Sequence, residues 1–293
     1  MRQKISVIIT DLDNTLYDWL TMWYQSFNVF IDRLEQDSHI PKNILIPEIR
    51  DIHQKHGTVE YEHLLRDIPS LQEKFKGEDL EKKFESSLIL LRDTQKYHLK
   101  LYPDTMNTLL YLKRIGVKII GYTDSKALPT SIRIKELGLD GVLDVVYSQP
   151  WIIKKREPLI HTHHNELSPA EGKPSVTGLL RIIQEIGADI EKCAYLGDSL
   201  VKDISMAQDS GVLDILVDYG KAHNTPAYEL LRTVSYWTPQ QIAHEKRILA
   251  NRSIVPTIEL KKSMAEILNH IEAEPFKTPR RTISAGITFN LDR

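Results

Sequence analysis

Two carboxylates, Asp11 and Asp13, lie close to the N-terminus and are separated by a single leucine. Acids two residues apart can address one small substrate from adjacent positions. One can attack a phosphorus atom as a nucleophile and form an aspartyl-phosphate, while the other protonates the leaving oxygen and later deprotonates the hydrolytic water. Asp and Asn are also common turn residues, so the run Asp11-Leu12-Asp13-Asn14-Thr15 alone fits a polar turn equally well.

A second polar group, Thr123-Asp124-Ser125, follows another apolar run. A hydroxyl and backbone amides at the end of a strand can hold a phosphoryl oxygen. A single threonine at that position is more commonly a helix cap, so this signal is weak when it is taken alone.

Lys173 precedes Pro174 and a predicted helix. An ammonium group close to a helix N-terminus is unfavourable with the helix dipole, and this favours an anion lying between the two. Most lysines are solvated surface residues, and Lys154 and Lys155 are alternative candidates for the same role.

A second acidic pair comes from Gly197-Asp198-Ser199 and Asp203. Together with Asp11 and Asp13 these residues would bring four carboxylates towards one point, and like charges so close cannot all stay ionised without compensation. A hard divalent cation supplies that compensation, and Mg²⁺ typically takes one or two carboxylates together with substrate phosphate. The acids therefore predict a Mg²⁺ site.

Short apolar runs rich in β-branched residues precede most of these groups. Strands buried on both faces of a parallel sheet have this character, apolar throughout instead of alternating. The predicted strands are Ile5–Thr10, Val117–Thr123, Cys193–Gly197, Val212–Val217 and, more weakly, Val142–Tyr147. Helical patterns that end at glycines lie between them, at Asp104–Ile115, Ser175–Ile186 and Asp203–Ser210. This alternation predicts an open, doubly wound, mainly parallel α/β sheet that binds ligands beyond the carboxyl ends of its strands.

The alternation is interrupted over residues 17–100, where helical periodicity occurs without a convincing strand. More than 80 residues is too long for a connecting loop, so we expect an all-helical domain inserted after the first strand. Residues 1–16 and 101–271 would then form the core. Residues 149–172, with three prolines and His161, His163 and His164, predict an extra loop or flap, and 272–293 predict a flexible C-terminal tail.

The composition argues against several classes of protein. With 38 basic and 40 acidic residues among 293, a net charge of −2 gives no electrostatic reason to expect a nucleic acid polymer or a membrane as partner. No run approaches the roughly 20 apolar residues of a membrane-spanning helix. The single Cys193 excludes an intrachain disulfide and fits a reducing compartment, so we expect a cytoplasmic protein, monomeric or homodimeric.

The order of these groups resembles the four motifs of the haloacid dehalogenase superfamily of Mg²⁺-dependent phosphohydrolases. The matching residues are Asp11-Leu12-Asp13-Asn14-Thr15, Thr123, Lys173, and Gly197-Asp198-Ser199 with Asp203. The resemblance implies a Rossmann-like core, with the helical insertion as a cap domain at the first insertion point of the family. The stretch 149–172 is longer than the corresponding segment of similar proteins.

The resemblance also assigns roles to single residues. Asp11 would be the nucleophile and Asp13 the general acid/base. Phosphate would be bound by Thr123, Asp124 and Lys173, and the Mg²⁺ ligands would be Asp11, Asp13 through its carbonyl group, Asp198 and Asp203. For Asp203 the resemblance leaves a second role open, which is to orient the lysine.

Asp13 separates two activities within the family. Members that cleave carbon–halogen bonds lack an acid at this position, because a halide leaves without a proton, whereas an alkoxide needs one. The resemblance therefore implies a Mg²⁺-dependent phosphatase whose partner is a small phosphorylated substrate such as a nucleoside monophosphate, a sugar phosphate or phosphoglycolate. The alternatives are a phosphotransferase or mutase of the same fold, and a non-catalytic Mg²⁺/phosphate-binding regulatory protein.

Overall fold

The computed structural model describes residues 2–151, 158–220, 225–235, 237, 243, 247 and 253–277. Within these residues the centre of the molecule is a seven-stranded sheet in the order β5-β4-β3-β2-β6-β7-β8. Its strands are β2 (Val7–Thr10), β3 (Lys118–Lys126), β4 (Val145–Gln149), β5 (His163–Glu166), β6 (Cys193–Gly197), β7 (Leu213–Val217) and β8 (Ile258–Leu260). Every neighbouring pair is parallel, which confirms the expected type of sheet.

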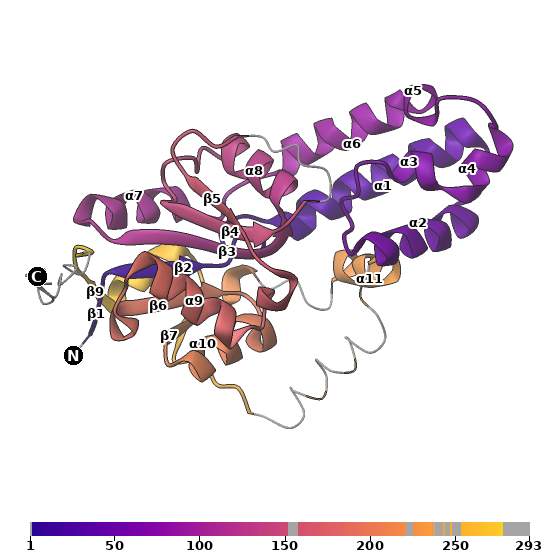
Figure 1. The fold of residues 1–293 in the computed structure, drawn as a ribbon. Coiled ribbons are helices and arrows are strands. Elements are labelled where there is room, and N and C mark those ends of the chain that lie inside the picture. Colours follow the sequence, from indigo (N-terminus) through magenta and orange to yellow (C-terminus); the bar gives the residue numbers. More distant parts are fainter. Residues whose placement is uncertain are drawn as a thin grey trace, which may run out of the picture.

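Helices cover both faces of this sheet (Figure 1). In the central strand β2, Ile8 faces one apolar layer while Val7 and Ile9 face the other, which explains the apolar run that precedes Thr10. The first layer includes α7 (Thr105–Ile115), α8 (Ala127–Glu136) and the short helix η5 (Met264–Asn269), and the second includes α9 (Val176–Ile186) and α10 (Ser205–Ser210). The doubly wound α/β architecture is therefore confirmed.

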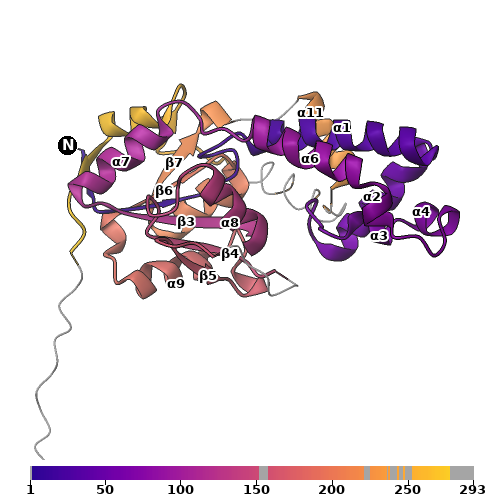
Figure 2. The same cartoon turned by 90° about the horizontal axis from the view of Figure 1, so that it is seen from above.

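Residues 17–100, called the helical region below, are described throughout and contain helices and no strand. They project from one end of the sheet (Figure 1, Figure 2). Trp23, Phe27 and Phe30 lie in a buried apolar cluster that is separate from the two layers on the sheet. The helices are α1 (Trp19–Ser38), α2 (Lys42–His56), α3 (Leu64–Asp67), α4 (Pro69–Lys74), α5 (Leu80–Lys83) and α6 (Glu85–His98). Nowhere in the described chain is a helix both long and apolar enough to cross a membrane.

Helix α11 (Pro226–Val234) leaves the sheet and packs against α1 and α2 of the helical region (Figure 1). Leu231 and Val234 are buried in the apolar cluster of that region. The ring nitrogen Nδ1 of His53 in α2 lies 2.7 Å from the carbonyl oxygen of Val234. The expectation that residues 101–271 all belong to the core is therefore wrong at α11, because its apolar side chains find their partners on the helical region.

The expected loop or flap at residues 149–172 is wrong at residues 163–166, which form the edge strand β5 and pair with β4. The carboxylate of Asp140 holds the chain before this strand, since it accepts hydrogen bonds from the backbone N–H groups of Ile160, His161 and Thr162 at 2.8, 3.0 and 2.8 Å. An edge strand has only one neighbour and is commonly polar, so β5 lacks the apolar run by which strands are recognised.

The prediction of a flexible C-terminal tail at 272–293 is wrong for its first residues. Strand β9 (Ile271–Ala273) pairs in parallel with β1 (Gln3–Ile5). The backbone N–H of Phe276 donates to the carbonyl oxygen of Gly116 at 2.8 Å, and the Phe276 ring packs against the second apolar layer of the sheet. Residues 278–293 lie outside the described residues.

The contact between His53 and α11 generates a prediction about pH. His53 is fully buried, and this burial lowers its pKa from 6.5 to about 4. Between pH 7 and pH 5 the unfolded chain takes up a proton at this histidine and the folded chain does not, so acid favours unfolding. We expect the wild type to lose about 2 kcal/mol more free energy of unfolding over this interval than His53→Leu, measured by urea denaturation. Equal losses in the two proteins would contradict the assignment.

Candidate active site

Asp11 follows directly after β2, the strand at which the order of the sheet reverses, with β3 on one side and β6 on the other. Its backbone N–H donates to the carbonyl oxygen of Leu196 in β6 at 2.8 Å, and the residue is 6% exposed. Ligands of open parallel sheets bind at this kind of switch point, beyond the carboxyl ends of the strands. The predicted nucleophile therefore lies where a site of this fold forms.

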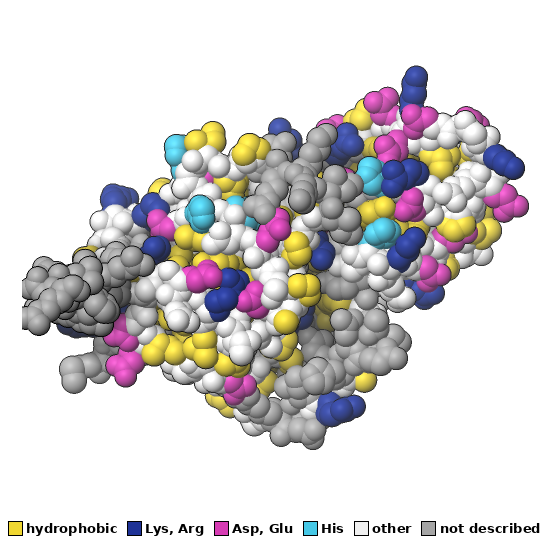
Figure 3. Space-filling model, viewed as in Figure 1, with side chains coloured by type: hydrophobic (Ala, Val, Ile, Leu, Met, Phe, Trp, Pro, Cys, Tyr) yellow, Lys and Arg dark blue, Asp and Glu magenta, His cyan; other side chains and the backbone are white. Residues whose placement is uncertain are grey.

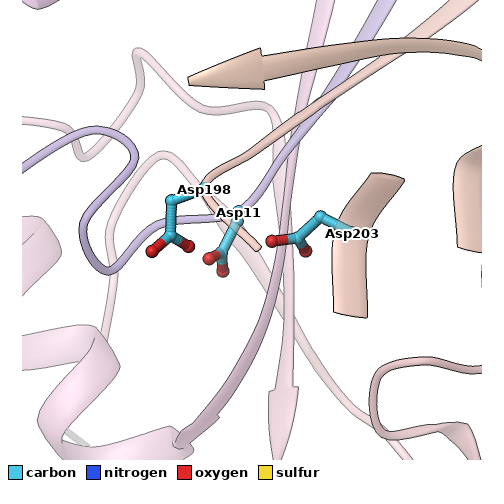
Figure 4. A group of neighbouring side chains, drawn as sticks. All are labelled: Asp11, Asp198 and Asp203. Atoms are coloured by element: carbon cyan, nitrogen blue, oxygen red, sulfur yellow. The ribbon is translucent and has the colours of Figure 1, made fainter. Parts of the chain in front are cut away.

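Three carboxylates meet at this point. Asp198 comes from the loop after β6, and Asp203 from the π-helical turn Leu200–Ile204. Asp11, Asp198 and Asp203 each have one carboxylate oxygen that lies within 4.8 Å of the corresponding oxygens of the other two. Figure 4 shows Asp11 between the two other side chains, with Asp203 pointing towards it. Oxygen atoms grouped in this way are the donor set that a hard divalent cation prefers.

Lys173 lies against this acidic group. Its Nζ is 2.7 Å from Oδ1 of Asp11 and 2.8 Å from Oδ1 of Asp203, and its side chain is 4% exposed. The structure thus brings Lys173 to the acids, whereas the alternatives Lys154 and Lys155 lie outside the described residues.

Asp203 is held by several donors at once. Besides the lysine, it accepts hydrogen bonds from the hydroxyl of Tyr195 at 2.9 Å and from the backbone N–H of Ser199 at 3.0 Å. A Cβ atom at Gly197 would overlap its carboxylate, which explains the glycine of Gly197-Asp198-Ser199 by close approach. Both oxygens of Asp203 therefore have donors within the protein, which is compatible with the second role that the resemblance leaves open, the orientation of Lys173.

The side chain of Asp124 already has two partners and is not suited to bind phosphate. Its carboxylate accepts from the backbone N–H of Lys173 at 2.8 Å and from Nζ of Lys202 at 3.0 Å. Although burial acts in the opposite direction, the two lysines hold the pKa of Asp124 below its usual range, so it carries a negative charge that repels phosphate. The predicted partner Thr123 lines the same cavity, and its hydroxyl accepts from the backbone N–H of Ser125 at 3.1 Å.

Asp13 lies apart from the three clustered carboxylates and belongs to a second network. One of its oxygens accepts a short hydrogen bond from the hydroxyl of Ser125, and the other lies 3.4 Å from Nη2 of Arg133. The guanidinium of Arg133 also pairs with Glu60 of the helical region at 2.7 Å. The carboxylate of Asp13 is therefore held by partners other than those of the acidic cluster.

The charges of the site perturb one another strongly. Burial, and then the neighbouring carboxylates, raise the pKa of Asp11 well above its usual range, although Lys173 acts against this. Burial and Asp203 raise the pKa of Asp198 to about 7. The pKa of Lys173 is raised because Asp11 and Asp203 outweigh the effect of its burial. A site with this excess of buried carboxylates over ammonium groups fits a divalent cation, which would stabilise the ionised acids.

A cavity of about 180 Å³ opens above these groups. Its polar lining includes Asp11, Lys173 and Asp198. Its apolar wall comes from Trp19, Leu20 and Val59 of the helical region, from Tyr228 and Leu231 of α11, and from Trp237 after that helix. A small molecule can therefore present a phosphate to the polar groups while the rest of it contacts the apolar wall.

Sequence reasoning missed Glu60, Arg133 and the residues that α11 contributes to the cavity. Arg133 lies on a helix of ordinary amphipathic pattern, and Glu60 in a segment between two helices. No local signal marks either one, because their importance comes from a contact between residues 73 positions apart.

Comparison with known proteins agrees with this geometry. Residues 5–211 match the family model described as haloacid dehalogenase-like hydrolase. The chain belongs to this family of hydrolases. The match spans all four predicted motifs, from Asp11 to Asp203, together with the helical region.

Relatives of this hydrolase are distant. Two proteins named "Glyceraldehyde 3-phosphate phosphatase" are each 24% identical to it. The alignment with the protein of Methanopyrus kandleri covers 74% of this chain and 85% of the relative. The alignment with the protein of Methanocaldococcus jannaschii covers 74% of this chain and 86% of the relative. The crystal structure of a HAD phosphatase from Thermococcus onnurineus aligns with a TM-score of 0.50 at 16% identity, over 93% of this chain and all of its own. These likenesses support the fold of the hydrolase.

The position of Lys173 generates a prediction about stability. Lys173→Met leaves Asp11 and Asp203 without the ammonium that they share, so we expect the free energy of unfolding to fall by about 3 kcal/mol in the absence of divalent cations. Added Mg²⁺ should raise the melting temperature of this variant more than that of the wild type, because the cation replaces the lost positive charge.

Urea denaturation measures the loss of free energy, and differential scanning fluorimetry measures the effect of Mg²⁺ on the melting temperature. The control is Lys192→Met, which removes an exposed lysine paired with Glu274 away from the site and should respond to Mg²⁺ like the wild type. If Mg²⁺ raised all three melting temperatures equally, Lys173 would not be compensating a cation-binding group of acids.

Proposed function

We propose that the protein is a Mg²⁺-dependent phosphomonoesterase that hydrolyses a small phosphorylated metabolite through an aspartyl-phosphate. The observation that carries the proposal is the buried contact of Lys173 with Asp11, 2.7 Å long, at the switch point of the sheet and beside Asp198. A purely structural ion pair does not need a further carboxylate at the same point, nor a cavity above it.

In the proposed first step, Oδ2 of Asp11 attacks phosphorus while Oδ1 stays with Lys173. The bond between Oδ2 and phosphorus forms as the bond between phosphorus and the leaving oxygen breaks. Asp13 gives its proton to the leaving oxygen. In the second step a water molecule attacks the phosphorus, Asp13 takes up a proton from it, and Asp11 is released with inorganic phosphate. The ammonium of Lys173 stabilises the phosphoryl oxygens in both steps.

The residues suited to hold Mg²⁺ are Asp11 and Asp198, with Asp203 behind them as the group that orients Lys173. When bound, the cation would neutralise the charge of the phosphoryl oxygens and of the acidic cluster. We propose that the helical region is the cap domain of this enzyme and that it closes over the cavity, with α11 as part of the same cover. Closure of this kind excludes water and makes the cover the element that selects the leaving group.

The size of the cavity supports a small substrate, with phosphate esters of trioses and sugars, nucleoside monophosphates and phosphoglycolate as the candidates. A phosphotransferase or mutase would return the phosphoryl group to a sugar, and a regulatory protein would bind phosphate without turnover. A cytoplasmic location and a monomeric or homodimeric state stay predictions.

A screen of these phosphorylated metabolites for release of inorganic phosphate tests the proposal. We expect release that requires Mg²⁺ and stops on chelation, and a loss of at least about 10³-fold in kcat for Asp11→Asn, because the amide oxygen is a far weaker nucleophile than the carboxylate. Asp13→Asn should lose about 10² to 10⁴-fold on alkyl phosphates. Undiminished phosphate release by Asp11→Asn would exclude the aspartyl-phosphate route.

Further outcomes separate the alternatives. Transfer of phosphate to an added sugar, without release of inorganic phosphate, would indicate a mutase or phosphotransferase. Saturable binding of phosphate with Mg²⁺, and no turnover of any ester, would indicate the regulatory protein.

A further inference from the structure

We infer that Arg133 is a positioning residue for Asp13, and that Glu60 of the helical region completes this role when the cover is closed. The inference rests on the proposed function, because Asp13 is the proton donor in it. Arg133 is absent from the lining of the cavity and therefore acts on the reaction only through its neighbours.

The guanidinium of Arg133 has a partner on each of its arms. Nε donates to the hydroxyl of Tyr17 at 3.1 Å, Nη1 to Glu60 at 2.7 Å, and Nη2 to the hydroxyl of Ser125 at 2.9 Å. The residue is 3% exposed. The guanidinium is a planar fork and its donors are fixed in direction, so these three contacts allow it only one orientation. A lysine ammonium on its flexible stem cannot make the same set of contacts.

This fork fixes the carboxylate of Asp13 from two directions. Nη2 of Arg133 lies 3.4 Å from one oxygen, while Ser125 accepts from the same Nη2 and donates to the other oxygen of Asp13. Rotation of the carboxylate would break the hydrogen bond from Ser125 and lengthen the ion pair with Arg133. Proton transfer needs the donor oxygen within hydrogen-bond distance of the leaving oxygen, so the arrangement of Arg133 and Ser125 determines the efficiency of Asp13.

Glu60 brings the helical region into the same network. Its backbone N–H donates to the hydroxyl of Thr58 at 3.1 Å, which holds the segment between α2 and α3, and Glu60 is one of the residues that line the cavity. Without Glu60 the buried guanidinium would have one carboxylate partner in place of two, and it would move towards Asp13. The pair therefore couples the position of the cover to the orientation of the proton donor.

Two kinds of leaving group distinguish a residue that positions Asp13 from one with a structural role. An alkoxide leaving group needs the proton of Asp13, whereas 2,4-dinitrophenolate leaves without one. A residue that only positions Asp13 should therefore matter for the first kind of ester and not for the second. The quantity to compare is kcat/KM, because it reports on the steps up to the first irreversible one, the formation of the phosphoenzyme, and not on the later hydrolysis.

The experiment measures kcat/KM for glycerol 2-phosphate and for 2,4-dinitrophenyl phosphate, with Mg²⁺, in the wild type, Arg133→Lys and Glu60→Gln. We expect kcat/KM for the alkyl ester to fall by about tenfold or more in both variants, and for the aryl ester to stay within about threefold of the wild type. Asp13→Asn is the reference, since it should show the same selectivity to a larger degree.

A control exists between the same two parts of the molecule, the helical region and α8 of the core. Lys96 of α6 and Glu136 of α8 form an exposed ion pair, 3.7 Å long, that also joins the helical region to the core but does not reach Asp13. Exposed pairs of this kind contribute little. Lys96→Gln should therefore leave both values of kcat/KM unchanged, which separates the positioning of Asp13 from a general loosening of the cover.

Several results would overturn the inference. Equal losses on both esters would mean that Arg133 has only a structural role, and no loss on either would mean that Asp13 is held by other groups. If Arg133→Lys does not fold, Glu60→Gln, which keeps the size of the side chain, is judged by the same criterion. A wild type that hydrolyses neither ester nor any metabolite of the screen would instead refute the proposed function itself.

Discussion

The buried ammonium of Lys173, shared by Asp11 and Asp203, is the interaction on which the rest of the site depends. Each of these charges would cost several kcal/mol if it were buried alone. Together they are tolerated because the donors around Asp203 are arranged for them, including Tyr195 and the backbone of Ser199. The carboxylates still outnumber the ammonium group, and this imbalance is the physical reason for expecting a divalent cation beside Asp11 and Asp198.

The sheet makes this arrangement possible because parallel strands end at one edge. The central position of β2, between β3 and β6, puts Asp11 beside Thr123 of β3 and beside the loop after β6 that carries Asp198. Close packing is needed as well: Gly197 leaves room for the Asp203 carboxylate, which a Cβ would overlap. The haloacid dehalogenase-like hydrolase fold thus assembles the site from segments that are far apart along the chain.

The apolar wall of the cavity comes from a different part of the molecule. It combines Trp19 and Leu20 of the helical region with Leu231 of α11, so a segment that follows β7 belongs to the proposed cover. In the coupling that we propose, the contact of Glu60 with Arg133 would transmit the position of this cover to Asp13. On the face drawn in Figure 3, basic and acidic side chains of the described residues are interspersed, without one dominant sign.

The sequence by itself determined five of the seven strands of the sheet, three of the helices that cover it and the acids at the strand ends, because apolar periodicity and residue chemistry are local properties. Only the tertiary structure decided that Lys173 meets Asp11, that the polar segment at His163 is a strand, and that α11 joins the helical region. The link from Arg133 to Glu60 likewise had no local signal. Edge pairing and buried charge networks depend on partners distant in the chain, and no pattern of neighbouring residues encodes them.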